Sequence, residues 1–184
     1  YVWVGTLNGL NRLDPETGEV TLVETADPVI RSLYCDEQGL LWIGSYGGLE
    51  VWDPATQNAT SAPVDLESTF VMSIQPAHDE TLLLGVWGQG IVRFDPATGN
   101  SETIVLGDER VYTVQHVTGG SIWAGTWGGG MYVVTPDGEQ LEFTAEEPQG
   151  LAADVVYSLM EDRAGLMWVG TNGGGVHKLS PRRS

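Results

Sequence analysis

The sequence predicts an all-β protein made of four-stranded antiparallel blades of a β-propeller. Glycine recurs at intervals of 39, 41, 40 and 45 residues in similar surroundings, and these landmark glycines are Gly5, Gly44, Gly85, Gly125 and Gly170. Short runs rich in Val, Ile, Tyr and Trp, bounded by Gly, Pro and Asp, indicate strands. No window keeps the apolar spacing of a helix. Several strands are apolar on both faces, and a period of about 40 residues is typical of propeller blades.

The first strand of every repeat after the first follows the pattern V-x-[ST]-Φ, where Φ is apolar. We expect these strands to lie nearest the propeller axis, with their hydroxyl residues at Ser32, Ser73, Thr113 and Ser158. The second strand carries the landmark glycine. Because strands ordinarily prefer Val or Thr there, we expect the backbone to approach a neighbouring strand or blade too closely for a side chain. Tryptophans of these strands are expected in the core: Trp3, Trp42, Trp123 and Trp168.

The third strand ends in an Asp-Pro turn in several repeats, as at Asp53-Pro54 and Asp95-Pro96. Proline presets φ for a type I turn, and the aspartate accepts hydrogen bonds from backbone amides. A weaker fourth strand follows, with sequences such as VTLVET and SETIVL.

One β-propeller segment is expected over residues 1–184. Its repeats run over residues 1–27, 28–68, 69–109, 110–153 and 154–184. The first and last repeats each have three strands, so the five blade positions do not close into a ring by completing one blade. We therefore expect a fragment of a larger propeller, whose remaining blades or another copy of the chain would be its partner. An open five-blade arc is the alternative.

The repeats resemble a known family. The pattern V-x-S-Φ-x-x-D-x-x-G-x-Φ-W-Φ-G-T-x-x-G-G-Φ is similar to the two-component regulator propeller repeat, most closely over Ile30–Leu49 and Val156–Val176. The resemblance implies an extracytoplasmic sensor propeller of hybrid histidine kinases and diguanylate cyclases, on the periplasmic or extracellular side of a bacterial membrane protein. Leu83 replaces the tryptophan in the third repeat, and Val117-Thr118-Gly119-Gly120 replaces the aspartate turn in the fourth. We interpret both departures as drift at structural positions.

Composition excludes some partners. The chain has 25 Asp and Glu against eight Lys and Arg, a formal net charge of −17. This charge repels phosphate backbones and anionic membrane surfaces, so neither nucleic acid nor direct membrane contact is expected. The single cysteine, Cys35, is expected to be a buried apolar residue.

No catalytic site, metal site or cofactor is expected. The histidines His78, His116 and His177 fall at different positions of three repeats, and no two are spaced as ligands on one element, so we do not expect them to converge. Carboxylates concentrate in turns, which is typical of solvated loops. The sequence therefore indicates a protein that is not an enzyme.

A candidate binding face lies at the turns between second and third strands. Two residues after four of the landmark glycines stand Tyr46, Trp87, Trp127 and Asn172, in turns that carry no charge. Equivalent turns of a propeller open on the same face, and Arg110 lies in a loop expected there. Aromatic rings among glycines suit stacking on a neutral ring such as a sugar. The alternative is that these aromatics wedge against the next blade as core.

These observations predict a non-catalytic, ligand-binding sensor segment that recognises a small molecule or carbohydrate, with Arg110 able to hold a carboxylate. Two alternatives stay open. Arg-Φ-Asp-Pro-x-Thr-Gly segments, such as residues 93–99, resemble those of streptogramin lyases, which are propeller enzymes. A propeller face can also serve as a protein-interaction platform.

Overall fold

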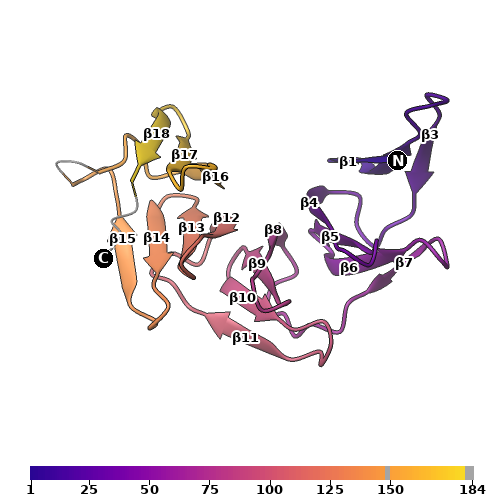
Figure 1. Ribbon diagram of the computed structural model, residues 1–184, viewed down its shortest axis with the longest axis horizontal. Coiled ribbons are helices and arrows are strands. Elements are labelled where there is room, and N and C mark those ends of the chain that lie inside the picture. Colours follow the sequence, from indigo (N-terminus) through magenta and orange to yellow (C-terminus); the bar gives the residue numbers. More distant parts are fainter. Residues whose placement is uncertain (148–149, 181–184) are drawn as a thin grey trace.

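The computed structural model describes residues 1–147 and 150–180, which form 18 strands in five antiparallel sheets (Figure 1). The first sheet holds β1 (Val2–Thr6), β2 (Gly9–Leu13) and β3 (Val20–Val23). The second holds β4 (Ile30–Cys35), β5 (Leu41–Ser45), β6 (Gly48–Asp53) and β7 (Asn58–Ser61). The third holds β8 (Val71–Pro76), β9 (Leu82–Val86), β10 (Gly90–Phe94) and β11 (Ser101–Ile104). The fourth holds β12 (Val111–His116), β13 (Ile122–Thr126), β14 (Met131–Val134) and β15 (Gln140–Phe143), and the fifth β16 (Val156–Glu161), β17 (Met167–Thr171) and β18 (Gly175–Leu179).

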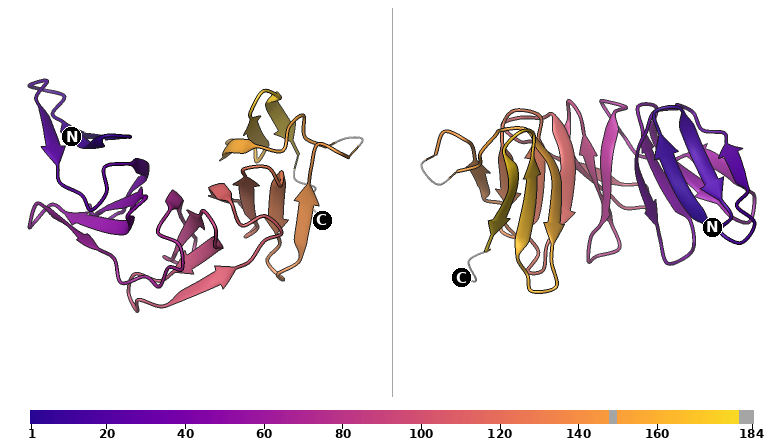
Figure 2. Two further views of the ribbon diagram at one scale, coloured as in Figure 1. Left: turned by 180° about the vertical axis from the view of Figure 1, so that it is seen from behind. Right: turned by 90° about the horizontal axis from the view of Figure 1, so that it is seen from above.

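The five sheets are propeller blades arranged in an arc, numbered here one to five along the chain. The prediction that first strands lie nearest the axis is confirmed, because β4, β8, β12 and β16 face the hollow of the arc and the fourth strands lie on its convex side (Figure 1). Seen from above, the blades stand side by side (Figure 2). The described residues contain no helix, and none of their segments qualifies as a membrane-spanning helix.

Central strands of the middle blades are buried on both faces because their alternate residues enter different blade interfaces. In β9, Leu82 and Leu84 pack towards blade two, whereas Leu83 packs towards blade four. In β13, Ile122 packs towards blade three and Trp123 towards blade five. The apolar runs of the sequence are therefore alternating strands with two dry faces.

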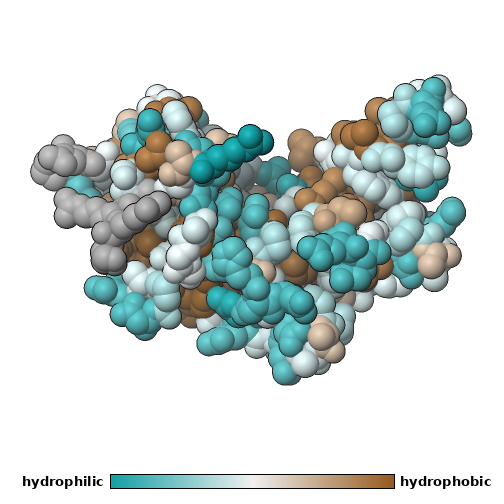
Figure 3. Space-filling model, in the orientation of Figure 1, coloured by the Kyte–Doolittle hydropathy of each residue, from teal (hydrophilic) through white to brown (hydrophobic). Residues whose placement is uncertain are grey.

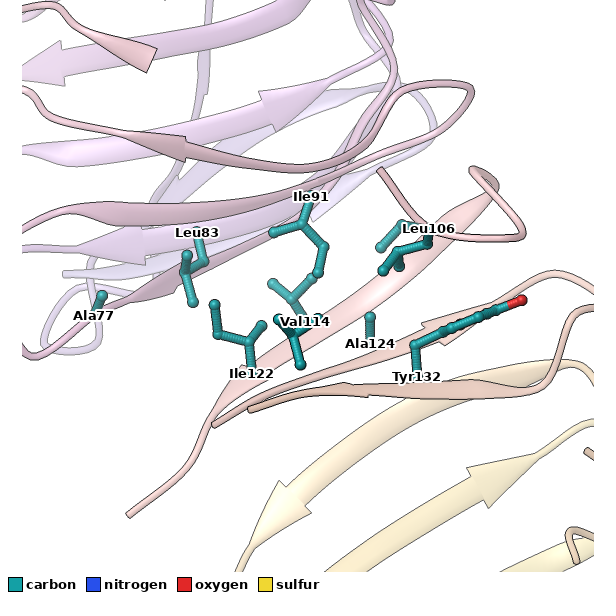
Figure 4. Close-up of a cluster of buried hydrophobic side chains, with 10 residues drawn as sticks. Ala77, Leu83, Ile91, Leu106, Val114, Ile122, Ala124 and Tyr132 are labelled. Carbon is teal, nitrogen blue, oxygen red and sulfur yellow. The ribbon is translucent and has the colours of Figure 1, made fainter. Parts of the chain in front are cut away.

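One hydrophobic cluster fills each of the four interfaces between blades. Between blades three and four, Leu83 and Ile91 meet Val114, Ile122 and other side chains of the next sheet (Figure 4). Hydrophilic residues cover most of the convex rim, and hydrophobic residues show in the hollow (Figure 3). Stability of the arc therefore comes mainly from blade-on-blade burial of apolar surface.

The landmark glycines of blades one to four lie where each blade touches the first strand of the next, whereas Gly170 of blade five faces Ser158 of its own first strand. A Cβ added at Gly125 would lie 2.5 Å from Cγ1 of Val156, and one added at Gly5 would lie 2.5 Å from Cγ2 of Ile30. At Gly44 the nearest atom would be Cγ1 of Val71, at 2.9 Å. None of these glycines has positive φ, so close approach and not backbone conformation accounts for them.

First-strand serines add a polar contact between blades. Oγ of Ser32 accepts a hydrogen bond from the amide of Ile74 at 3.0 Å, and Oγ of Ser73 accepts one from Val114 at 3.2 Å. Both bonds run from the first strand of one blade to the first strand of the next. The [ST] position of the repeat therefore helps to fix the spacing of blades around the axis.

The incomplete end blades explain two departures from expectation, because β1 is the inner edge strand of blade one and blade five is covered on one face only among the described residues. Trp42 and Trp123 are buried as predicted, whereas Trp3 and Trp168, in blades one and five, are only half-buried. The expectation that Cys35 is buried is wrong, because its thiol is exposed. Cys35 pairs with Leu41, which faces blade one, and among the described residues that blade has no first strand to cover the thiol.

We expect Gly125→Ala to lower the free energy of unfolding by about 2 kcal/mol, because the added methyl group overpacks the interface with Val156. Chemical denaturation measures the change. In a Val156→Ala background the same substitution should cost less, because the nearest methyl group is gone. An equal penalty in both backgrounds would contradict the close-approach explanation.

Candidate functional site

A cavity of about 400 Å³ opens at the inner edges of blades two, three and four. We call it the aromatic cavity. Its lining residues come from first strands, from the turns between second and third strands and from one entry loop: Arg31, Tyr46, Phe70, Met72, Trp87, Tyr112 and Trp127. Five of these seven side chains are aromatic, and Arg31 is the single charged one. The volume falls within the range of small-molecule sites.

The turns that carry Tyr46 and Trp127 are fixed by the residue before each aromatic. The hydroxyl of Thr126 donates to the carbonyl of Gly130 at 2.9 Å and accepts from the amide of Gly129 at 3.0 Å. The hydroxyl of Ser45 accepts from the amide of Gly47 in the same way. The buried hydroxyl residue of the Gly-[ST] pair therefore orients the aromatic residue that follows it.

The backbone also ties each of these turns to the loop that enters the same blade. The amides of Tyr46, Trp87 and Trp127 donate to the carbonyls of Val29, Phe70 and Arg110, respectively. Each acceptor stands two residues before a first-strand residue that has no partner in the second strand, namely Arg31, Met72 or Tyr112. Turns and first strands are thus held together at one end of the blades.

A β-bulge in each first strand supplies the second set of lining residues. The register between first and second strands skips one residue in all four complete first strands, namely Arg31, Met72, Tyr112 and Tyr157. Bulges re-aim side chains and increase local twist. Three of these four residues line the cavity, and Tyr157 continues its ring cluster with a centroid distance of 5.4 Å to Trp127.

The rings contact one another both within blade four and across blade boundaries. Trp87 and Trp127 have centroids 5.8 Å apart, Tyr112 and Trp127 5.5 Å, and Tyr46 and Phe70 4.6 Å. These distances are those of tilted and edge-to-face aromatic pairs. Trp127 is 36 % exposed and Phe70 is 42 % exposed, and neither belongs to an interface cluster. The cluster therefore presents rings at a surface and does not fill a core.

The structure separates the residues that the sequence grouped together. Tyr46, Trp87 and Trp127 meet at the cavity, whereas Asn172 is exposed in blade five and is not among its lining residues. Arg110 is also outside the lining, because Asp108 holds its guanidinium at 2.9 and 2.5 Å. Hydrogen bonding and the charge of Asp108 raise the pKa of Arg110 further.

Sequence reasoning did not identify Arg31, Phe70, Met72 and Tyr112 as site residues. Arg31, Met72 and Tyr112 occupy the x position of V-x-[ST]-Φ, next to a hydroxyl residue that recurs in every complete first strand. The available signal was thus a position whose residue type varies but whose place in the repeat is always the same. Its side-chain types alone gave no pattern.

Two histidines that appeared unrelated in the sequence lie side by side. His78, in the turn after β8, and His116, at the end of β12, have ring centroids 4.4 Å apart. Nδ1 of His116 is buried and has no hydrogen-bond partner among the described residues. The expectation that the histidines do not converge is therefore wrong for this pair. Among the described residues, no group of three or more His, Cys, Asp or Glu side chains is arranged to hold a metal ion.

The histidine pair and the aromatic cavity lie at opposite ends of the blades. His78 belongs to the turn between first and second strands, whereas Trp87 belongs to the turn between second and third strands. Strand β9 separates the two turns. The lining of the aromatic cavity contains no histidine and no carboxylate.

Residues 25–47 and 150–173 match the family model described as two component regulator propeller. These two segments are two-component regulator propeller repeats. Both matched repeats keep the aspartate and the tryptophan of the motif, and Nε1 of Trp42 donates to Oδ2 of Asp36 at 2.9 Å. Nε1 of Trp168 donates to Asp162 at the same distance. The motif aspartate thus fixes its hairpin and its tryptophan, which gives this part of the repeat a structural role.

Solved structures share the propeller fold. The extracellular domains of two proteins from B. thetaiotaomicron, described as hybrid two component systems, superpose with TM-scores of 0.85 and 0.81 at 20% identity. The alignments cover 96% and 98% of this chain but only 25% and 26% of those chains, so the chain spans about a quarter of their length. Virginiamycin B lyase from Staphylococcus aureus superposes with a TM-score of 0.73 at 13% identity, over 98% of this chain and 66% of the lyase. No curated protein gives a significant match.

The histidine pair predicts a pH dependence of the propeller's stability. Burial, together with the nearby His78 and Arg93, lowers the pKa of His116 below its ordinary value, although Asp79 acts in the opposite direction. His116 therefore binds a proton more readily in the unfolded chain than in the folded chain. As a result, the free energy of unfolding decreases as the pH falls through about 6.5 towards the pKa of His116 in the folded chain. We expect His116→Gln to lose less stability than the parent protein between about pH 7.5 and pH 5.5.

Chemical denaturation of both proteins at the two pH values measures this difference, in which the effects of all other groups cancel. His78→Gln should reduce the pH dependence of stability less than His116→Gln does, because it removes only one of the causes that lower the pKa of His116. Parallel losses in all three proteins would show that His116 does not titrate differently on folding.

Proposed function

We propose that the chain is a non-catalytic, ligand-binding segment of an extracytoplasmic bacterial sensor, and that the aromatic cavity binds a small molecule with a ring, a carbohydrate. The observation that carries the proposal is the aromatic cavity itself, in which rings from three blades converge at one surface. None of these rings belongs to a hydrophobic cluster between blades.

A sugar suits this lining chemically. One face of a pyranose ring carries mainly C–H groups, and such a face stacks on Trp and Tyr rings. The hydroxyl groups of Tyr46 and Tyr112 and the indole N–H groups of Trp87 and Trp127 offer polar partners at the ring edges. An apolar lining with a few polar groups is the usual composition of a small-molecule site.

The sensor assignment has its own support. The two-component regulator propeller repeats and the fold shared with extracellular domains of hybrid two component systems both favour it. We infer the periplasmic or extracellular side of a bacterial membrane protein on the same grounds. The remaining blades, or another copy of the chain, would be the structural partner.

A propeller enzyme is the second candidate, favoured by the fold shared with virginiamycin B lyase. The lining of the aromatic cavity favours binding over catalysis, because it holds no histidine and no carboxylate, the side chains that most often act as general acid or base. Turnover of any carbohydrate or lactone substrate by the purified protein would overturn the non-catalytic proposal.

We expect the double variant Trp87→Ala, Trp127→Ala to bind a carbohydrate ligand one to two decades more weakly than the parent protein. Each lost stacking contact removes about 1 kcal/mol, by analogy with aromatic pairs. The ligand is first identified from a panel of neutral and acidic oligosaccharides by thermal shift, and its dissociation constant is then measured by calorimetry.

Leu7→Ala is the matched control. Leu7 occupies the same repeat position in blade one, is 68% exposed and does not line the cavity. This variant should bind as the parent does. Unfolding of the double variant would identify the tryptophans as core residues, and unchanged affinity with an intact fold would place the site elsewhere.

A further inference from the structure

Arg31 is the charged residue of the aromatic cavity, and its surroundings leave its charge unpaired. The ion pairs of the described residues join Arg93 to Asp79 and Arg110 to Asp108, and none involves Arg31. In a chain with 25 Asp and Glu and only eight Lys and Arg, carboxylates are abundant as partners. The fold nevertheless aims this guanidinium at a cavity whose lining has no carboxylate.

The contacts of Arg31 orient its guanidinium without satisfying it. Its Cζ lies 5.2 Å from the centroid of the Tyr112 ring, and Nη2 donates to the Tyr112 hydroxyl. Nε is buried and has no hydrogen-bond partner among the described residues. A cation–π contact holds the plane of a guanidinium but supplies no acceptor for its N–H groups. The N–H donors of the Arg31 guanidinium are thus held in place, but not all of them have an acceptor.

The position of Arg31 is fixed by the backbone. It is the unpaired residue of the bulge between Ile30 and Ser32, and Oγ of Ser32 bonds the next blade. The bulge is thereby anchored on both sides by residues with structural roles. The Arg31 side chain at the bulge belongs to no interface cluster, so blade packing does not dictate the residue type at this position, which is available for ligand contact.

We propose that Arg31 is an anion subsite of the aromatic cavity, and that the ligand carries a carboxylate on a six-membered ring. This inference rests on the proposed function. The ring stacks on the Trp87 and Trp127 side of the cavity, and the carboxylate takes the planar donor fork of Arg31 in the bidentate geometry that guanidinium favours. Two sources supply this chemistry, a uronic acid residue of an acidic oligosaccharide and an aromatic carboxylate.

The test compares three probes on the purified protein by calorimetry: a galacturonate trisaccharide, the neutral galactose trisaccharide and 4-hydroxybenzoate. The parent protein should bind the acidic sugar about tenfold or more tightly than the neutral one. Arg31→Gln should abolish this preference, so that the acidic and the neutral sugar bind with the same affinity. Arg31→Lys, which keeps the charge but not the fork, should give an intermediate preference.

Arg110→Gln is the control, since Arg110 is already paired with Asp108. It should bind all three probes as the parent does. Preference for the acid should also fall when ionic strength rises from about 0.02 M to about 0.5 M, because salt screens the pair. A preference that survives Arg31→Gln, or that disappears in Arg110→Gln, would overturn the assignment.

The outcomes separate this inference from the function on which it rests. Equal binding of acidic and neutral sugars would overturn the anion subsite and leave carbohydrate recognition standing. Binding of 4-hydroxybenzoate alone, lost in Arg31→Gln, would support the subsite and overturn the carbohydrate ligand. Absence of binding by all three probes, with the protein folded, would count against both.

Discussion

Contact between the landmark glycines of blades one to four and the first strand of the next blade is the constraint on which the arc depends. Removal of one side chain lets a valine or isoleucine of the neighbouring blade reach the backbone of the second strand. This contact sets the distance between blades near the axis, where the sheets are closest. It also places the serine hydroxyls within reach of the next first strand, so apolar contact and hydrogen bonding reinforce each other.

Most of the fold could be predicted because it repeats. One glycine pattern, one hydroxyl position and one turn type recur at similar intervals. A strand or turn that is poorly defined in one repeat can therefore be assigned from the equivalent segment of the others. The end blades show the limit of this approach. Trp3 and Trp168 occupy the same strand position as Trp42, yet burial depends on the neighbouring blade as well as on the residue.

The candidate site could be predicted only in part. Tyr46, Trp87 and Trp127 stand out because glycines surround them in uncharged turns. Arg31 does not stand out, because the direction of a bulged side chain is not encoded in its residue type. The pairing of Arg110 with Asp108 and the meeting of His78 with His116 each depend on loop geometry. The period of the repeats identifies residues that occupy the same position in different blades. It does not indicate which residues at different positions of the repeat contact each other between neighbouring blades or loops.

The rings of the aromatic cavity belong to different blades, and this has a mechanical consequence. Tyr46 is carried by blade two, Trp87 by blade three and Trp127 by blade four. A molecule held between them would resist any change in the angle between these sheets. Occupancy of a small volume at the axis would thereby alter the stiffness of the arc out to its rim, without rearrangement of any single blade.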